Sequence, residues 1–368
     1  MHDLPALARF GGLVATGLVD VTADPAALDS SGFWAVSADF EGRVVCARFA
    51  DVRREAVPAP VPGRWTGPAA DDWTSSLDRA AYTAGVRRIR ELIAAGQVYQ
   101  ANLCRVLSAP LAPGADVDAL TALLARGNPA PYAGTIRLPG HGVEIATASP
   151  ELFLRRTGRV VESGPIKGTG RTEADLLEKD HAENVMIVDL VRNDLGRVCA
   201  TGSVTVPDLC VVEKHPGLVH LVSTVRGALR EDVGWPELLG AAFPPGSVTG
   251  APKSSALRII GELETAPRGP YCGGIGWVDA DRGTGELAVG IRTFWIDRDE
   301  GVLRFGSGAG ITWGSDPQRE WEETELKAAR LLAVASGEYP GAYDAGEAGG
   351  LTSARGAGVA DRKSTPGR

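Results

Sequence analysis

The chain has 368 residues, of which 44% are hydrophobic, 23% charged and 6% aromatic, and its formal net charge is −8. This is the composition of a globular protein with room for one large core or two smaller ones. The acidic balance argues against a nucleic-acid or anionic-membrane surface, and no apolar run reaches the roughly 18 residues of a membrane span.

The cysteines and histidines argue against a disulfide framework or a zinc site. The five cysteines are odd in number and include no CxxC pair, and the five histidines show no HExxH spacing. Any metal is therefore expected on carboxylates, the ligands that suit Mg²⁺. The first residues lack the basic and then apolar pattern of a signal peptide, so a cytoplasmic protein is expected.

Residues 1–74 are predicted to form a short N-terminal lobe rich in β-strands, followed by a linker. Apolar runs at 33–36 and 44–46 alternate with Gly, Asp and Pro, as in strands joined by turns. Residues 57–67 are rich in proline and are typical of a connection. A larger domain is expected to follow.

The larger domain, residues 75–340, is expected to open on an amphipathic helix. Tyr82, Ile89 and the apolar residues around them recur at steps of three and four, and Gly96 is placed to end the helix. Residues 97–103 then predict a strand rich in side-chain amides, which taken alone is most often half-exposed.

A second helix and a hairpin lead towards the middle of the chain. The helix is expected at 117–126, and the hairpin at 136–146 around a Pro-Gly-His-Gly turn. The segment 149–153 follows directly, and a strand then enters 163–169.

Residues 173–195 predict a long helix on which Asp180, Glu183 and Asp194 lie near one face. Acidic residues on a mixed face commonly meet solvent, so a structural reading and a functional one are left open here. The later elements are a turn into a strand over 211–225, a helix at 235–242, a helix opening at 252, a strand pair at 273–278 and 287–296, and a strand at 303–305 that feeds a glycine-rich run.

The last helix is well marked by its sequence. Asp316 is a good N-cap and Pro317 a good first residue, and Glu320, Glu323 and Lys327 then share one face. Beyond it the composition turns to Gly, Ala, Ser and charged residues, so 341–368 is expected to be a disordered tail.

Two glycine-rich loops were candidates for nucleotide binding. In 246–254 three residues separate Gly246 from Gly250 and a proline precedes Lys253, which does not match the P-loop spacing. The run 306–310 does not complete GxGxxG. Both loops can still present main-chain N–H groups to a small carboxylate or phosphate ligand, helped by a helix N-terminus after Pro252.

Lys167 lies in the stretch Ser163–Thr169, with glycine on both sides of the Pro-Ile-Lys core. Glycine allows a tight bend and a close approach by a ligand. A lysine is a nucleophile only when neutral, and a snug, partly apolar pocket lowers its pKa towards that state. Taken alone, a lysine on a turn is most often an exposed surface residue.

Read together, several blocks resemble the chorismate-utilising enzymes, over about residues 75–337. The resemblance implies an α+β fold, a sandwich of two large antiparallel β-sheets with outer helices and a ligand cleft between the sheets. It makes 75–340 the chorismate-binding catalytic domain. The blocks are SPELF (149–153), PIKGT (165–169), KDHAENVMIVDLVRNDLGRV (179–198), VEKHPGLVHLVSTV (212–225), FPPGSVTGAPK (243–253), GPYCGGIG (269–276), IRT (291–293) and GSGAGITWGSDPQREWEETELKA (306–328).

Enzymes of this family bind chorismate with Mg²⁺ coordinated to one of the chorismate carboxylates. The resemblance implies Glu183 and Glu323 as direct ligands, with Asp180 and Glu320 in supporting or water-mediated contact, although the members of each pair could exchange roles. Hard oxygen ligands of this kind suit Mg²⁺.

The resemblance also assigns the rest of the ligand site. Glu151 is implied as the general acid for the departing C4 hydroxyl, which requires a carboxyl that is protonated near neutral pH. His220 is expected against the ring and Thr249 nearby. The other ligand carboxylate is expected to meet Arg292, Tyr271 and the N–H groups of Gly308 and Gly310, with Gly250, Ala251 and Lys327 also at the substrate.

Within the family, lysine in PIKGT is typical of aminodeoxychorismate synthases, whereas enzymes that make anthranilate carry alanine there. The implied chemistry is attack by Lys167 on C2 of chorismate, followed by entry of ammonia at C4. Isochorismate and salicylate synthases use an earlier lysine to activate water, and the equivalent place here, 97–100, has none. The family usually continues Arg-Pro-Arg after PIKGT; Gly170 departs from this, so a more mobile loop is expected.

None of the five cysteines lies in a nucleophile elbow, so ammonia is expected from a separate glutamine amidotransferase subunit. The leading hypothesis is an aminodeoxychorismate synthase component that feeds p-aminobenzoate for folate or a related metabolite. The alternatives are an anthranilate-type synthase with an idle Lys167, and a catalytically silent chorismate-binding or amidotransferase-docking protein.

Overall fold

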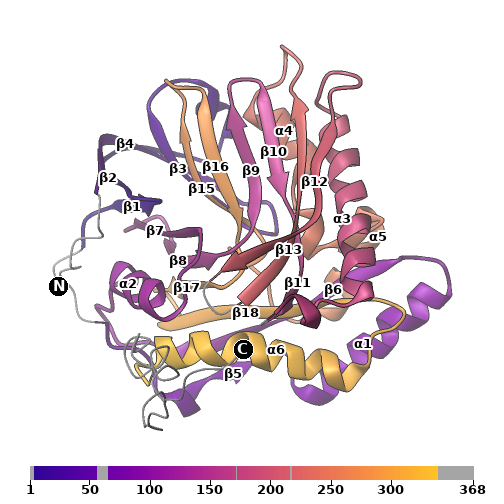
Figure 1. Cartoon of the computed structure of the whole chain (residues 1–368). Coiled ribbons are helices and arrows are strands. Elements are labelled where there is room, and N and C mark those ends of the chain that lie inside the picture. The colour runs from indigo at the N-terminus through magenta and orange to yellow at the C-terminus, as the bar shows by residue number, and fades with distance from the viewer. Residues whose placement is uncertain (1–3, 56–64, 171, 216–217, 339–368) are drawn as a thin grey trace, which may run out of the picture.

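The strands of this protein form an extended antiparallel β-system, shown in Figure 1. The computed structural model describes residues 4–55, 65–170, 172–215 and 218–338. The strands are β1 (Leu7–Phe10), β2 (Leu13–Thr22), β3 (Phe33–Ala38), β4 (Val44–Arg54), β5 (Thr74–Ser75), β6 (Gln100–Pro110), β7 (Tyr132–Leu138), β8 (Val143–Ser149), β9 (Leu152–Thr157), β10 (Val160–Gly164), β11 (Ile166–Gly170), β12 (Thr205–His215), β13 (Leu218–Ala228), β14 (Gly250–Ala251), β15 (Gly274–Asp279), β16 (Thr284–Val289), β17 (Thr293–Asp297) and β18 (Val302–Ile311).

The strand pairings run in one continuous order. From β12 they pass through β13, β10, β9, β16, β15, β3 and β4 to β2, and from β1 through β7, β8, β17 and β18 to β6. The β1–β2 hairpin joins the two runs. In Figure 1 the strands of the first run stand upright, and β17, β18 and β6 cross beneath them. The α+β class and the large antiparallel sheet are confirmed, with both runs in one hydrogen-bonded system.

Helices cover the outer faces of these strands. They are α1 (Arg79–Ala94), α2 (Val117–Gly127), α3 (Glu178–Gly196), α4 (Trp235–Ala242), α5 (Lys253–Leu263) and α6 (Pro317–Ala335), with short 3₁₀ turns η1 (Pro25–Asp29), η2 (Ala70–Asp72), η3 (Glu173–Asp175) and η4 (Gly246–Val248). α6 packs against β18 and α1, α2 against β7 and β8, α3 against β13, β12 and β11, and α5 against β6.

The sequence signals at helix ends act as predicted. Asp316 caps α6, because its carboxylate accepts the N–H groups of Gln318 and Arg319 at 3.1 and 3.0 Å. At the end of α1, Gly96 has φ +72°, the left-handed conformation that favours glycine. The predicted helices at 117–126 and 235–242 are confirmed as α2 and α4.

Two elements that were predicted to be continuous are interrupted in the structure, so these predictions are wrong. The helix expected over 173–195 is divided, because Leu176 and Leu177 are extended between η3 and α3. The strand expected over 287–296 is interrupted between β16 and β17, where Arg292 has φ +52°. The interruption at Arg292 matters for the site, because a continuous strand could not turn its backbone in this way.

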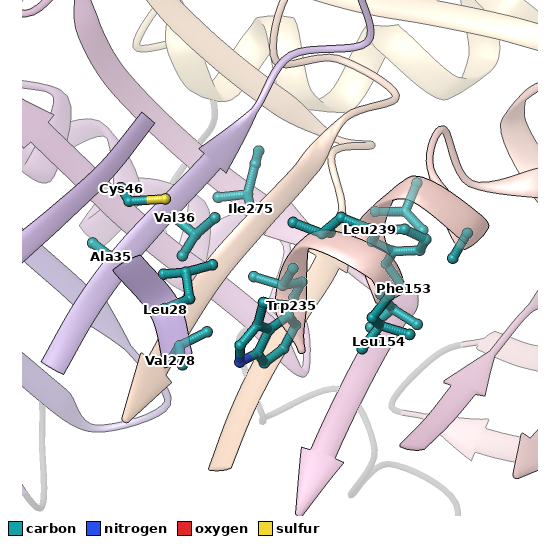
Figure 2. Packing of buried hydrophobic residues seen from close by; sticks show 14 of the residues in the cluster. Leu28, Ala35, Val36, Cys46, Phe153, Leu154, Trp235, Leu239, Ile275 and Val278 are labelled. Carbon is teal, nitrogen blue, oxygen red and sulfur yellow. The ribbon is translucent and has the colours of Figure 1, made fainter. Parts of the chain in front are cut away.

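The main hydrophobic core joins segments that are distant in sequence. Figure 2 shows Trp235 of α4 packed among Leu28 of η1, Val278 of β15 and Leu154 of β9. Leu28 and Leu154 are each 1% exposed, so they pack at the density of an interior. This core holds β9, which follows Glu151, in a fixed position.

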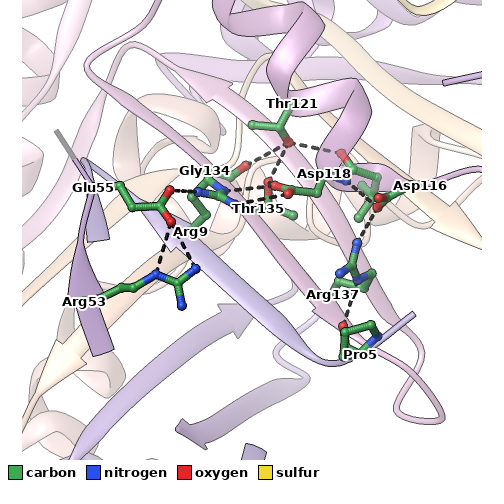
Figure 3. Close-up of polar contacts among 11 residues, drawn as sticks. Pro5, Arg9, Arg53, Glu55, Asp116, Asp118, Thr121, Gly134, Thr135 and Arg137 are labelled. Carbon is green, nitrogen blue, oxygen red and sulfur yellow. Dashed lines mark hydrogen bonds and ion pairs between the residues drawn. The ribbon is translucent and has the colours of Figure 1, made fainter. Parts of the chain in front are cut away.

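Ion pairs between charged side chains connect the N-terminal strands to α2. Figure 3 shows Arg9 between Glu55 and Asp118, and Arg137 paired with Asp116. The Arg9 Nη1 lies 2.8 Å from the Glu55 carboxylate. The described part of 1–74 is rich in strands, and β1 pairs with β7 while β3 pairs with β15. The predicted tail, 341–368, and most of the proline-rich connection lie outside the described residues.

The cap at Asp316 gives a test of the fold. Asp316→Ala should lower the free energy of unfolding by about 1 kcal/mol, because two N–H groups at the start of α6 lose their acceptor. Urea denaturation followed by circular dichroism measures this. Asp299→Ala, an exposed aspartate outside any helix, is the matched control and should change stability by less than about 0.5 kcal/mol.

Candidate active site

Lys167 lies in a bulge of β11. The strand pairs with β13 at Ile166 and again at Thr169, and three residue steps on β11 match two on β13. Lys167 and Gly168 occupy this shift, and bulges of this kind re-aim a side chain. Gly168 has φ +82°, and a Cβ there would come within 2.9 Å of the Asp180 Cβ. Glycine is therefore required after the lysine, as the Lys-Gly sequence suggested.

Ser247, in η4, connects Lys167 with Glu151. The Lys167 Nζ donates a hydrogen bond to the Ser247 main-chain oxygen at 3.1 Å, and the Ser247 side chain hydrogen-bonds the Glu151 carboxyl. Asn102 also donates to the Ser247 oxygen, at 3.4 Å. One buried residue thus fixes the nucleophile candidate and the acid candidate relative to each other.

Glu151 is a buried carboxyl between β8 and β9. Its main-chain N–H donates to the Ser149 hydroxyl at 3.2 Å, and its side chain is 4% exposed. Burial raises the pKa of Glu151 to about 7, although the Ser247 hydrogen bond, the Lys167 charge and the Ile166 N–H act in the opposite direction. A carboxyl with this pKa is available as a proton donor near neutral pH.

Lys167 is shifted towards its neutral form. Burial lowers its pKa, while the carboxylates of Glu183, Glu151 and Glu323 favour the ammonium form and oppose that shift. The net direction is downward from the ordinary value. A larger fraction of neutral amine is the condition that a lysine nucleophile needs.

Arg292 presents a guanidinium that no described side chain pairs with. It lies in the interruption between β16 and β17, where its main-chain oxygen accepts the Ala148 N–H at 3.0 Å. Burial lowers its pKa, and no carboxylate compensates for this. Within the described residues the Arg292 side chain has no hydrogen bond or ion pair. A desolvated cation in this state is well suited to a ligand carboxylate.

The glycines of β18 lie against β6. A Cβ at Gly310 would collide with the Gln100 amide, and one at Gly308 with the Cys104 thiol. The Gly308 oxygen accepts a hydrogen bond from Lys327 at 3.1 Å. Tyr271 is 5% exposed and its ring packs over Gly306, so it lies in the same layer but deep in the core.

The loop around η4 carries Thr249, Gly250 and Ala251. The Thr249 hydroxyl donates to Pro245 and Gly246 oxygens at 3.1 and 3.2 Å, so it closes its own loop. Gly250 and Ala251 form β14, which pairs with β6. His220 is 3% exposed on β13, opposite Thr169 of β11, and so lies beside the lysine strand.

The acidic residues of α3 and α6 interact with each other and with lysines. Burial raises the pKa values of Glu183 and Glu320. For Glu323, burial acts upward, but Lys327 at 2.6 Å and the nearby Lys179 and Lys167 bring its pKa below the ordinary value. The charge of Glu323 also raises the pKa of Glu183, and Lys167 and Lys179 act on both carboxyls, so the two lie towards the same region.

A metal would have to displace existing partners from these carboxylates. Asp180 is already engaged, because its Oδ2 accepts the Leu177 N–H at 2.8 Å at the start of α3. In the part of the chain that the structure describes, no three His, Cys, Asp or Glu side chains gather closely enough to hold a metal ion. The carboxylate oxygens of Glu183 and Glu323 suit a hard cation. Such a cation would take over the neutralisation of these carboxylates from the lysine ammonium groups around them.

Sequence reasoning missed the role of Ser247 and undervalued Gln100 and Asn102. The two amides are 0% and 7% exposed, in contrast to the half-exposed strand expected there. Gln100 donates to the Asn102 side chain at 3.4 Å. The sequence feature that could have indicated them is the cluster of amide side chains on one strand. These side chains become buried only when a partner strand such as β18 lies against that strand.

Comparison with known proteins shows the family. Residues 27–333 match the family described as chorismate binding enzyme. The chain belongs to this family. This chorismate-binding enzyme is 41% identical over 272 residues to anthranilate synthase component 1 1 of Haloarcula marismortui, covering 70% of the chain and 54% of that protein. It is 37% identical over 319 residues to aminodeoxychorismate synthase component 1 of Salmonella typhimurium, covering 81% and 68%.

Solved structures of related fold agree with the architecture. A putative 2,3-dihydroxybenzoate-specific isochorismate synthase from Bacillus anthracis superposes with TM-score 0.76 at 24% identity, covering 91% of this chain and 97% of that one. Anthranilate synthase component I of Streptococcus pneumoniae gives 0.74 at 24% identity, covering 90% and 93%. No helix in the described residues is long and apolar enough to cross a membrane.

Glu151 gives a pH test that is independent of activity. Its folded-state pKa is raised from 4.5 to about 7, so protonation stabilises the folded protein. That stabilisation is full below the unfolded pKa and is lost as pH rises through about 7. Relative to Glu151→Gln, the parent should lose about 3 kcal/mol of unfolding free energy between pH 4 and 8.

Urea denaturation at a series of pH values measures this difference. The matched control is Glu178→Gln, an exposed carboxyl at the start of α3, which should run parallel to the parent across the same range. A Glu151→Gln curve that also runs parallel to the parent would contradict the assignment of a raised pKa.

Proposed function

We propose that this protein is the chorismate-aminating component of an aminodeoxychorismate synthase, which converts chorismate and ammonia to 4-amino-4-deoxychorismate. The observation that carries the proposal is Lys167, directed by the β11 bulge to the Ser247 carbonyl beside the buried acid Glu151. Named relatives include aminodeoxychorismate synthase component 1 of Salmonella typhimurium and of Escherichia coli. A surface lysine would have neither this burial nor this neighbour.

The proposed reaction proceeds through a covalent adduct. The neutral Lys167 amine forms a bond to C2 of chorismate, the two conjugated double bonds of the ring each shift by one position, and the C4–O bond breaks. Glu151 gives its proton to the departing hydroxyl, which leaves as water. Ammonia then bonds to C4, both ring double bonds shift back, and the C2–N bond to Lys167 breaks. Dividing one substitution into two steps lowers the barrier of each.

The ligand carboxylates have separate proposed partners. Arg292, which has no side-chain partner among the described residues, would bind one carboxylate together with the N–H groups of Gly308 and Gly310. Glu183 and Glu323 would hold Mg²⁺ at the other, where Mg²⁺ supplies charge neutralisation. Asp180 and Glu320 would support that site from one helical turn away.

The ammonia source is proposed to be a separate glutamine amidotransferase. Several relatives are named component 1, which implies a second component. The chain spans 54% and 58% of the lengths of the anthranilate synthase components of Haloarcula marismortui and Streptomyces coelicolor, so the activity of the whole relatives is carried over only as a proposal. A cytoplasmic location and a p-aminobenzoate product pathway belong to the same proposal.

Anthranilate synthesis is the second candidate. Relatives with 41% identity are named anthranilate synthase component 1, and aminodeoxychorismate and anthranilate synthases match over similar lengths. In that case ammonia would add at C2 and Lys167 would take no covalent part. The two functions differ in product, so one assay separates them.

Product identification tests the proposal. The protein with chorismate, Mg²⁺ and ammonium should form aminodeoxychorismate, and Lys167→Ala should lose about 10² to 10⁴ of the rate, as expected when a directly participating group is removed. Liquid chromatography with mass detection measures both. Lys214→Ala, an exposed lysine paired with Glu173, is the control and should retain the parent rate. Anthranilate as the parent's product would overturn the proposal.

Metal dependence tests the carboxylate assignment. Isothermal titration of Mg²⁺ into the chorismate-loaded protein should show binding that Glu183→Gln or Glu323→Gln weakens by at least about tenfold, because each removes a direct oxygen ligand. Asp180→Asn should have the smaller effect, since one Asp180 oxygen already accepts the Leu177 N–H. Equal losses for Asp180→Asn and Glu183→Gln would contradict this order.

A further inference from the structure

A small, partly open cavity adjoins the buried carboxyl of Glu151. Its volume is about 20 Å³, enough for a single water. Glu151 and Ser247 line one part of it and Val191, Asp194 and Leu195 of α3 another. The cavity therefore lies between the acid of the active site and a helix whose far side faces the surface.

The polar groups that line this cavity favour the binding of an ordered water. Ser163 is 6% exposed, lines the cavity, and its hydroxyl has no hydrogen-bond partner among the described residues. Asp194 and Glu151, also on the lining, are 6% and 4% exposed. Empty protein cavities are apolar, whereas a cavity with several polar partners holds an ordered water.

The Asp194–Lys253 ion pair connects the cavity lining with the protein surface. The Lys253 Nζ donates to its Oδ2 at 2.7 Å and to the Ala242 oxygen at 3.0 Å. The Lys253 side chain is 17% exposed and that of Asp194 9%, so the pair spans from the interior to the surface. Arg197 is the other charge near Asp194, and Lys167 is the charge near Glu151. The reaction as proposed does not use the Asp194–Lys253 pair.

We propose that one water in this cavity connects Glu151 and Ser163 to Asp194, and that the Asp194–Lys253 pair returns a proton to Glu151 through it after each turnover. The inference rests on the proposed function, in which Glu151 loses a proton to the departing hydroxyl. Ser163, Asp194 and Lys253 are then positioning residues, because they act through Glu151 and touch no substrate.

The proton count leaves Glu151 deprotonated at the end of each turnover, which is where a return path would act. In each turnover Glu151 gives one proton to the leaving hydroxyl. Neutral ammonia keeps its three protons when it bonds to C4 and becomes an ammonium group there, and Lys167 leaves as the neutral amine, so neither restores the Glu151 proton. One proton passes from the Lys253 ammonium to the Asp194 carboxylate, from Asp194 to the water, and from the water to the Glu151 carboxylate. Solvent then reprotonates Lys253. A closed ligand cleft would leave this rear path as the one in contact with solvent.

Rapid mixing separates the return step from the chemical step. The protein is first held below pH 7, so that Glu151 is protonated, and then mixed with chorismate, Mg²⁺ and ammonium. In Asp194→Asn, the first turnover should stay within about 2-fold of the parent and later turnovers should slow by at least about 10-fold, in the range of proton-transfer effects. The expected signature is a burst of one chorismate per protein.

Asp116→Asn is the matched control, because it also neutralises a buried aspartate paired with a cation, Arg137, but far from the cavity in sequence and outside its lining. Any loss of stability it causes should slow both phases together, without a burst. Ser163→Val fills the cavity and leaves the Asp194–Lys253 ion pair intact, and it should show the same burst. This second variant keeps the test valid if Asp194→Asn does not fold.

A crystal structure at high resolution supplies the second readout. Density for a water bonded to the Ser163 hydroxyl and the Glu151 carboxyl is expected in the parent and not in Ser163→Val. A dry cavity, or equal slowing of both phases in Asp194→Asn and Ser163→Val, would overturn the relay. Absence of any chorismate consumption by the parent would instead overturn the proposed function, and the crystal readout would still judge the water.

Discussion

Desolvation around Ser247 is the constraint on which the candidate site depends. Burial acts on Glu151 and Lys167 in opposite senses: it raises the pKa of the acid to about 7 and lowers that of the amine. Each group is thereby brought towards the uncharged form that its proposed role requires. The Ser247 carbonyl and hydroxyl hold the two together.

Much of the architecture could be predicted from local signals. The cap at Asp316, the end of α1 at Gly96 and the helix α4 follow from residues that act within one turn. The interruption at Arg292 could not be predicted, because its positive φ depends on the contact between its main-chain oxygen and Ala148 of β8. Long-range strand pairing of that kind leaves no periodic pattern in the sequence.

The site was predictable in its residue types and less so in its contacts. The sequence motifs predict Lys167 and Glu151 as site residues, and the structure brings both to Ser247. Ser247 itself was not singled out, since a serine in a proline- and glycine-rich loop resembles many loop residues. The burial of Gln100 depends on β18 and β14 lying against β6 from distant parts of the chain.

Direct observation of the covalent adduct on Lys167 is the most decisive measurement for this account. The protein should be incubated with chorismate and Mg²⁺ without ammonia, quenched in acid, and analysed by intact and peptide mass spectrometry. The account predicts a mass increase of one chorismate less one water, located on the peptide that contains Lys167 and absent from Lys167→Ala. Consumption of chorismate with no added mass on that peptide in the absence of ammonia, or an adduct on another residue, would contradict it.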